Sequence, residues 1–217
     1  MVRARAPGEG VILDGQALRE RFAQPRTWQP VQTGDRPTTT AAASARAAAV
    51  LILLVERPEG LHLLLTRRTD HLHDHAGQIS FPGGRVEPTD RDPIETALRE
   101  TEEEIGLEHS RIEVLGSLGP QGIYRTGTGY HVTPVVGLTR LPLILAPDSF
   151  EVAEVFEVPL DVVLDPHNHQ RNTVVNLGAS RQYHAIPYGR YYIWGATAAM
   201  LLNFRAFLQP LPWGESS

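Results

Sequence analysis

The sequence predicts an α+β fold in which a single mixed β-sheet lies between helices. Several short apolar runs bounded by turn residues have the length and composition of strands, and two longer segments, at 93–105 and 196–208, predict helices. No segment repeats along the chain. With 217 residues, 41% of them hydrophobic, the protein can bury the core of one domain.

The first 47 residues predict a lead-in to this domain. Asp14 can cap a short helix through GQALRERFAQ. The prolines that follow, Gly34 and the run TTTAAASARAAA predict an irregular segment. We therefore place a lead-in at 1–47 and the domain at 48–217.

The rest of the chain alternates strand signals with turns. Two apolar runs flank Pro58 and Gly60, which predicts a hairpin, and the segment HLHDHAGQISFPGG predicts a loop. A second hairpin is expected to turn at Pro187 to Gly189, before the last helix. The expected strands and the short helix, in order, are 49–55, 61–66, 111–118, 131–138, 154–160 and the helix 161–165.

The helix at 93–105 has clear start and stop signals. Asp92 can act as N-cap, with Pro93 at the first helical position and Glu95 in the capping-box position. Gly106 supplies the left-handed residue that ends a helix.

This helix concentrates negative charge on one stripe. At about 100° per residue its apolar side chains gather on one side, and the opposite side carries Glu100, Glu103 and Glu104. Such a stripe is either a solvated face or a site for a hard divalent cation, which prefers oxygen ligands. Like charges three and four positions apart repel, and no lysine offsets them, which favours the cation site.

A glycine-rich loop precedes the helix, and the combination resembles the Nudix box. Phe81-Pro82-Gly83-Gly84 is followed by the run RETEEEIGL from Arg99 to Leu107. The resemblance implies a Nudix fold, an α/β/α sandwich, with hydrolysis of a nucleoside-linked diphosphate. Two features depart from the pattern: the loop is one residue longer than usual, and Asp90 stands where glutamate is customary. The acid that pairs with Arg99 is therefore Asp90 or Glu87.

A second likeness narrows the expected substrate. The segment LLTRRT at 64–69, then Gly77 and the FPGG loop, resembles the extra motif of the coenzyme A pyrophosphatase branch, and GRYYIWGATAAML at 189–201 is similar to that branch too. The likeness implies cleavage of coenzyme A to 3′,5′-ADP and 4′-phosphopantetheine. His73 stands where the motif usually has arginine, and imidazole cannot offer the charged fork of guanidinium.

The resemblance also implies roles for individual residues. Mg2+ or Mn2+ is expected on Glu100 and Glu104, with Glu103 as ligand or water-bridging partner and the Gly84 carbonyl as a further ligand. Arg99 is expected to orient this cluster.

Further roles concern the proton acceptor and the phosphates. The candidate proton acceptors are Glu103 and Glu151. The candidates for substrate binding are Gly83, Arg67, Arg68 and Arg85. Tyr191 and Trp194 are expected in the core rather than as adenine platforms, and GTG at 127–129 is expected to be a turn.

Composition narrows the class of protein. The net charge is −5 and no lysine- or arginine-rich block occurs, so a general nucleic-acid binder is not expected. The longest apolar run, 47–55, is too short to span a bilayer, and MVRARAPGEG lacks the apolar stretch of a secretory signal. We expect a cytoplasmic enzyme with a small-molecule substrate and leave its oligomeric state open.

Two alternatives to coenzyme A hydrolysis stay open at this point. One is a Nudix enzyme for another nucleoside diphosphate derivative, such as NADH or ADP-ribose, which His73 favours. The other is a non-catalytic Nudix domain that binds a nucleotide, which the intact set of glutamates disfavours.

Overall fold

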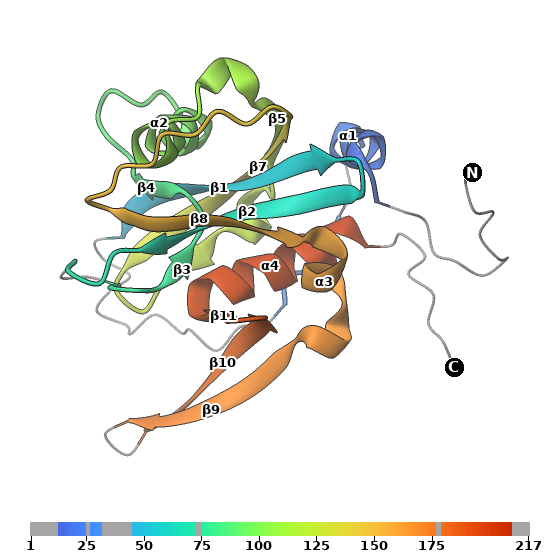
Figure 1. The fold of residues 1–217 in the computed structure, drawn as a ribbon. Helices are drawn as coiled ribbons and strands as arrows, with labels where there is room; N and C mark the ends of the chain where they lie inside the picture. Colours follow the sequence, from blue (N-terminus) through green and yellow to red (C-terminus); the bar gives the residue numbers. More distant parts are fainter. Residues whose placement is uncertain (1–12, 25–26, 32–44, 73–74, 177–178, 210–217) are drawn as a thin grey trace, which may run out of the picture.

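The computed structural model describes residues 13–24, 27–31, 45–72, 75–176 and 179–209. Eight of the described strands form a mixed sheet around β1 (Arg46–Arg57). Figure 1 shows β1 running between its neighbours in this sheet. β1 pairs antiparallel with β2 (Gly60–Arg68) and parallel with β7 (Tyr130–Arg140). The other strands of this sheet are β3 (Ile79–Ser80), β4 (Gly83–Arg85), β5 (Glu113–Ser117), β6 (Tyr124–Arg125) and β8 (Val152–Pro159).

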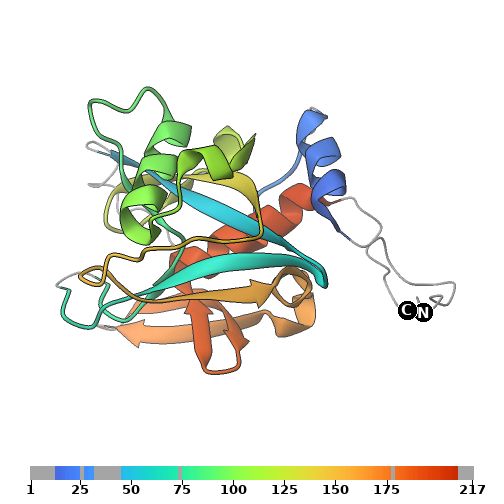
Figure 2. The ribbon, with the colours of Figure 1, turned by 45° about the horizontal axis from the view of Figure 1, so that its top comes forward.

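Helices cover both faces of this sheet. α2 (Pro93–Ile105) lies on one face and α4 (Gly195–Leu208) on the other, and Figures 1 and 2 show the two from different sides. Ile52 and Leu54 belong to the core cluster that contains α4, whereas Leu53 lies in the cluster under α2. Because side chains alternate along a strand, a strand covered on both faces is apolar at every position. The layered α+β arrangement confirms the predicted fold class.

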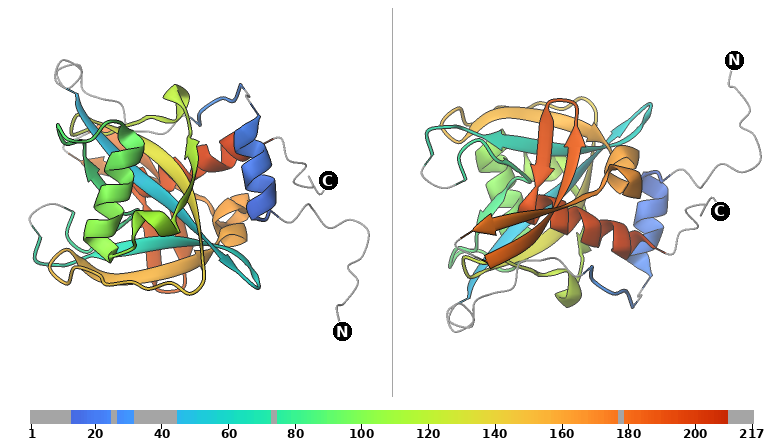
Figure 3. Two further views of the ribbon diagram at one scale, coloured as in Figure 1. Left: turned by 90° about the horizontal axis from the view of Figure 1, so that it is seen from above. Right: turned by 90° about the horizontal axis from the view of Figure 1, so that it is seen from below.

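The prediction of one sheet is incomplete. β9 (Gln170–Asn176), β10 (Ala179–Tyr188) and β11 (Tyr191–Trp194) form a separate antiparallel sheet, and Figure 3 shows it beside α4. β9 has the polar sequence QRNTVVN, which did not predict a strand. The predicted second hairpin is present, but Pro187 still pairs with Tyr192, so the chain turns later than expected.

Most remaining elements match their predictions with shifted ends. The first hairpin turns at residues 58–59, as expected, and the GTG segment is a turn. The predicted loop before α2 contains the two short strands β3 and β4, so that prediction was wrong there. α3 spans Leu160–Leu164, and three short 3-10 helices complete the described elements, at His109–Arg111, Pro120–Gly122 and Pro166–Asn168. His73 lies outside the described residues.

The lead-in contacts the body of the protein. Asp14 caps α1 (Gly15–Ala23), since its side chain accepts from the Ala17 N–H as predicted, and the helix buries Leu18 completely. The Trp28 ring packs edge-on against Phe207 of α4 at 5.9 Å. The boundary between lead-in and domain stays a prediction. None of the helices in the described ranges is long and apolar enough to cross a bilayer.

If α1 is part of the core, Leu18→Ala should lower the free energy of unfolding by about 2 to 5 kcal/mol, because it leaves a cavity. Urea unfolding of the whole chain measures this loss. Gln16→Ala on the exposed face of the same helix is the matched control and should change stability by less than about 0.5 kcal/mol. Equal effects of the two substitutions would show that α1 is not packed in solution.

Candidate active site

The predicted caps position α2. The Asp92 carboxylate accepts from the Glu95 N–H at 2.9 Å, and Gly106 has φ 69° and ψ 18°. Both ends of the helix are where the sequence placed them. The capping box is modified, however, since the Glu95 carboxylate accepts from the Arg91 N–H at 2.6 Å and not from that of Asp92.

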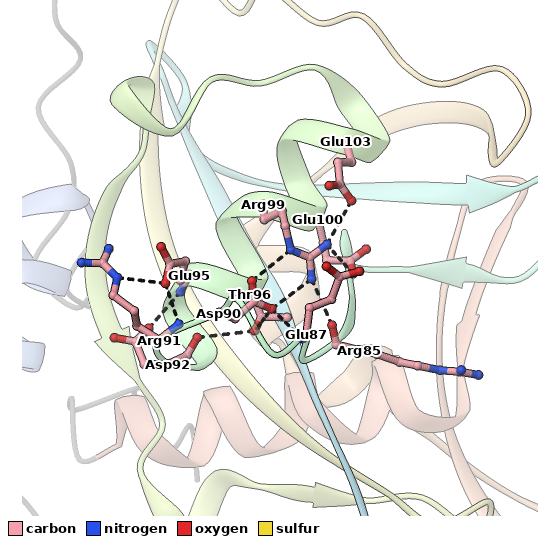
Figure 4. A network of polar contacts seen from close by, with 10 residues as sticks. All are labelled: Arg85, Glu87, Asp90, Arg91, Asp92, Glu95, Thr96, Arg99, Glu100 and Glu103. Carbon is pink, nitrogen blue, oxygen red and sulfur yellow. Dashed lines mark hydrogen bonds and ion pairs between the residues drawn. The ribbon is translucent and has the colours of Figure 1, made fainter.

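Arg99 ties α2 to the loop that precedes it (Figure 4). Its guanidinium donates two hydrogen bonds of 3.0 Å to the Asp90 carboxylate and one of 3.1 Å to the Arg85 carbonyl. The Asp90 side chain is only 3% exposed and also accepts from the Thr96 hydroxyl at 2.8 Å. The hydrogen bonds from Arg99 hold the pKa of Asp90 well below its usual range. Asp90, not Glu87, is therefore the partner of Arg99.

The same guanidinium reaches two of the predicted metal ligands. One of its terminal nitrogens lies 3.0 Å from a carboxylate oxygen of Glu100 and 3.0 Å from one of Glu103. Gly84 lies directly against Glu100, since a Cβ on Gly84 would be 2.4 Å from that carboxylate. Burial raises the pKa of Glu100, and the negative charges of Glu103 and Glu151 add to this effect.

Glu104 is the buried acid of the site. The sequence placed it on the stripe opposite the apolar side of α2, but it is only 6% exposed, because α2 turns its Ala97 and Thr101 side toward the sheet and Glu104 follows on that side. The expected position was wrong in this respect. Burial raises the pKa of Glu104 to about 8, although the nearby charge of Arg68 lowers it. In the described residues Glu104 thus has too little positive charge around it to ionise readily.

Arg68 joins Glu104 to a second acidic segment. Its two terminal nitrogens lie 3.8 Å from a Glu104 oxygen and 3.6 Å from a Glu151 oxygen, while its Nε is buried with no hydrogen-bond partner among the described residues. Glu151 comes from the turn before β8, so two distant segments supply the acids of one site. A half-buried carboxylate, a buried carboxylate and a partly paired guanidinium meet here.

The other candidates lie at different distances from this cluster. Arg67 pairs with Glu154 at 3.6 Å and Asp70 at 3.7 Å, away from Glu104. Gly83 has φ 153°, and a Cβ there would lie 2.4 Å from the Ala49 carbonyl oxygen, so β4 can pair closely with β1 only with glycine at this position. Arg85 is exposed and does not belong to the acidic cluster.

A cavity of about 940 Å³ opens beside the cluster. Arg68 and Gly83 line one part of it, and aromatic side chains of the second sheet line another, among them Tyr183, Tyr192 and Trp194. Trp194 is 42% exposed, so the prediction that it is core was wrong. Its neighbour Ile193 is fully buried, so the alternation of the strand puts Trp194 on the other face of β11, where its ring contacts Tyr183. The sequence could have suggested this only if the buried face of the second sheet had been known.

Tyr191, the neighbour predicted with it, does pack inward. Its ring stacks on Phe156 at 3.7 Å, and its hydroxyl donates to Glu154 at 2.7 Å. The alternation of the strand thus separates two aromatic residues that look equivalent in the sequence.

The acids provide the type of donor atom that a divalent cation binds, but in this structure their oxygens do not converge on one point. No group of three acidic or histidine side chains in the described ranges is close enough to hold a metal ion. The donors are nevertheless the oxygen ligands that Mg2+ and Mn2+ prefer, and the raised pKa values of Glu100 and Glu104 mark carboxylates that would gain from a cation. The residues therefore fit such an ion, with Arg99 holding Glu100 and Glu103 beside Gly84.

Comparison with known proteins gives matches over most of the chain. The model of the NUDIX domain family matches residues 45–177. A protein of Yersinia pestis (strain Pestoides F) named Nudix hydrolase NudL is 42% identical over 151 residues, which cover 70% of this chain and 74% of that protein. The NudL protein of Yersinia pseudotuberculosis serotype O:1b matches with the same figures.

Solved structures of the same kind are also similar. A Nudix hydrolase of M. smegmatis, RenU, is 25% identical with a TM-score of 0.46, covering 54% of this chain and 71% of that one. The NUDIX domain of Shewanella oneidensis NrtR, solved with ADP ribose, is 22% identical with a TM-score of 0.42, covering 58% and 80%.

Asp90→Asn should lower the free energy of unfolding by about 2 kcal/mol or more, because the Arg99 guanidinium loses charge-assisted hydrogen bonds. Chemical denaturation measures the change, and Glu87→Gln, at an exposed neighbour, is the control that should leave stability unchanged. In the parent protein the contribution of Asp90 should be lost as the pH falls below the usual pKa of aspartate, because the folded-state pKa is lowered. A larger effect of Glu87→Gln would reverse our assignment.

Glu104 should make the metal-free protein less stable as the pH rises. Its folded pKa of about 8 lies above the usual 4.5, so between these values the folded state keeps a proton that the unfolded state has released. With a chelator present, the melting temperature should therefore fall from pH 5 to pH 8, and Glu104→Gln should flatten this slope. Glu102→Gln, on the exposed side of the same helix, should keep it. Parallel slopes for all three proteins would contradict the assignment.

Proposed function

We propose that this chain, which belongs to the Nudix hydrolase family, cleaves the diphosphate of coenzyme A or of its acyl derivatives. As a member of that family it is a pyrophosphohydrolase that acts on a nucleoside diphosphate derivative. The observation that carries the proposal is the meeting of Glu100, Glu104 and Glu151 with Arg68 at the edge of a large cavity. The products would be 3′,5′-ADP and 4′-phosphopantetheine or its acyl form.

The shape and lining of the cavity support a long substrate with unlike ends. Its volume of about 940 Å³ is near the upper end of the range for small-molecule sites. Polar side chains such as Gln78 and Ser80 line it near Arg68, whereas Trp194 and Met200 provide apolar surface elsewhere. Coenzyme A combines a charged nucleotide with a long pantetheine arm, which suits this division.

The acids would hold Mg2+ or Mn2+, with Glu100 and Glu104 as ligands, Glu103 as ligand or bridging partner and the Gly84 carbonyl beside them. Bound there, the ion supplies charge neutralisation at the phosphate oxygens and lowers the pKa of an attacking water. Arg68 lies 3.8 Å from Glu104 and can turn its charge from that carboxylate to a substrate phosphate. Arg99 keeps Glu100 and Glu103 in place through its bond to Asp90.

The reaction needs a base for the water that attacks phosphorus. An oxygen–phosphorus bond forms from the water, the phosphoanhydride bond breaks, and the water proton passes to a carboxylate. Glu103 and Glu151 are the candidates, since they are 59% and 43% exposed and thus open to solvent. Glu103 is held by Arg99 at 3.0 Å, whereas Glu151 lies 3.6 Å from Arg68, so the looser contact leaves the Glu151 carboxylate more available to accept the proton.

A second candidate function is hydrolysis of another nucleoside diphosphate derivative, such as NADH or ADP-ribose. His73 favours it, because the coenzyme A motif has arginine at this position. A nucleotide-binding domain without catalysis is a further outcome of the test. A cytoplasmic location and the absence of nucleic-acid partners stay predictions.

A substrate panel tests the proposal. Coenzyme A, acetyl-CoA, NADH, ADP-ribose and a nucleoside triphosphate are incubated with the protein and Mg2+ or Mn2+, and products are identified by mass. We expect 3′,5′-ADP from coenzyme A to be released fastest. Faster cleavage of NADH or ADP-ribose would replace our assignment with the second candidate.

Glu104→Gln should lower kcat by about a hundredfold or more, because one metal ligand loses its charge. Glu102→Gln on the same helix is the matched control, since its carboxylate pairs with His109 outside the site. Circular dichroism checks that both variants stay folded. Full activity of folded Glu104→Gln would remove Glu104 from the site.

A further inference from the structure

Two arginines lie over one aromatic ring at the edge of the cavity. The guanidinium carbon of Arg46 is 4.1 Å from the centre of the Tyr130 ring, and that of Arg85 is 5.5 Å away. The sheet brings them together, because β1 pairs Arg46 with Tyr130 and β4 pairs Arg85 with Ala48. Tyr130 itself lines the cavity.

These two guanidiniums lack counter-charges among the described residues. Arg19, Arg57 and Arg99 each pair with carboxylates at 3.0 Å or less. Arg46 and Arg85 have no such ion pair within the described ranges, and the Arg46 guanidinium donates one hydrogen bond, of 3.4 Å, to the Thr128 carbonyl. The cavity lining in the described part of the chain contains no carboxylate either. In a chain of net charge −5, this is a positive patch that the protein does not neutralise itself.

The patch lies next to the proposed diphosphate site. Arg85 follows Gly84, which contacts Glu100. The Arg85 carbonyl accepts a hydrogen bond of 3.1 Å from Arg99. Figure 4 shows the Arg85 side chain extending away from the Arg99 network. An anionic group at the patch would therefore be close to the scissile diphosphate but separate from it, as a phosphate on the ribose of the same nucleotide is.

The turn after β6 completes the surroundings. Thr126, Gly127 and Thr128 line the cavity, and the two threonine hydroxyls lie 3.0 Å apart. One of the two can donate to the other while the second stays available to a ligand. The predicted turn at 127–129 thus borders the patch.

We propose that Arg46 and Arg85, held over Tyr130 beside this turn, bind the 3′-phosphate of the nucleotide half of the substrate. The inference rests on the proposed function and names the substrate class: nucleoside diphosphate derivatives that carry a ribose phosphomonoester. Guanidinium forks match phosphate oxygens in two parallel hydrogen bonds, and an aromatic face orients the guanidinium plane. Substrates without this group, such as ADP-ribose, leave the two charges uncompensated.

The test compares coenzyme A with 3′-dephospho-coenzyme A in steady-state kinetics. The parent enzyme should prefer coenzyme A in kcat/KM by about tenfold or more, the range expected for a charge-assisted contact. In Arg46→Gln, Arg85→Gln and the double variant, this ratio should fall toward one. Arg111→Gln should keep the ratio, because Arg111 lies near the Arg140 end of β7, roughly 30 Å along the strand from Tyr130 and away from the cavity described above.

A binding measurement separates this inference from the proposed function. Calorimetric titration with 3′,5′-ADP and with AMP should show tighter binding of 3′,5′-ADP to the parent protein, and the double variant should bind both alike. If coenzyme A is cleaved but the parent enzyme shows no preference in either measurement, or the double variant retains it, the inference is wrong and the proposed function stands. If coenzyme A is not cleaved, the titration alone decides on the subsite.

Discussion

The pair between Arg99 and Asp90 is the interaction on which the site depends. One guanidinium holds the loop through Asp90 and the Arg85 carbonyl, and it holds the helix through Glu100 and Glu103. Because Arg99 is itself part of α2, these bonds set where the glycine turn lies against the helix. Without these bonds, the position of Gly84 relative to Glu100 would not be fixed. The Arg85 side chain would then not be directed away from the acids and toward Tyr130.

The sheet makes this arrangement possible by supplying a rigid base. β1 is buried on both faces, so its register with β4 and β7 is set by packing as well as by hydrogen bonds. Its register with β4 requires glycine at position 83, and its register with β7 brings Arg46 to Tyr130. β1 therefore positions two features. On one side it positions the turn at Gly83 and Gly84, which faces the acids, and on the other side it positions the positive patch.

The sequence predicted local features well because their causes are local. The caps of α2 depend on Asp92, Pro93 and Gly106 within one segment, and the helix begins and ends where these residues placed it. The burial of Glu104 was missed because it depends on how α2 is rotated against the sheet, and period alone cannot show this. The exposure of Trp194 was missed for a similar reason. Because β9 is polar, the sequence did not show that the last hairpin belongs to a separate sheet.

The charges of the site show why acids and arginines occur together here. Glu104 is buried with a pKa of about 8, so the described residues do not stabilise its ionised form fully, and Arg68 at 3.8 Å is a weak partner. A closer arginine would stabilise the carboxylate but would also compete with a cation for its oxygens. A distant arginine leaves the carboxylate available and stays free for phosphate. The loose contact of Arg68 thus stabilises the Glu104 carboxylate only partly in the absence of ligand, but it leaves Arg68 available to bind phosphate. The short hydrogen bonds of Arg99, in contrast, have a structural role, because they hold the loop against the helix.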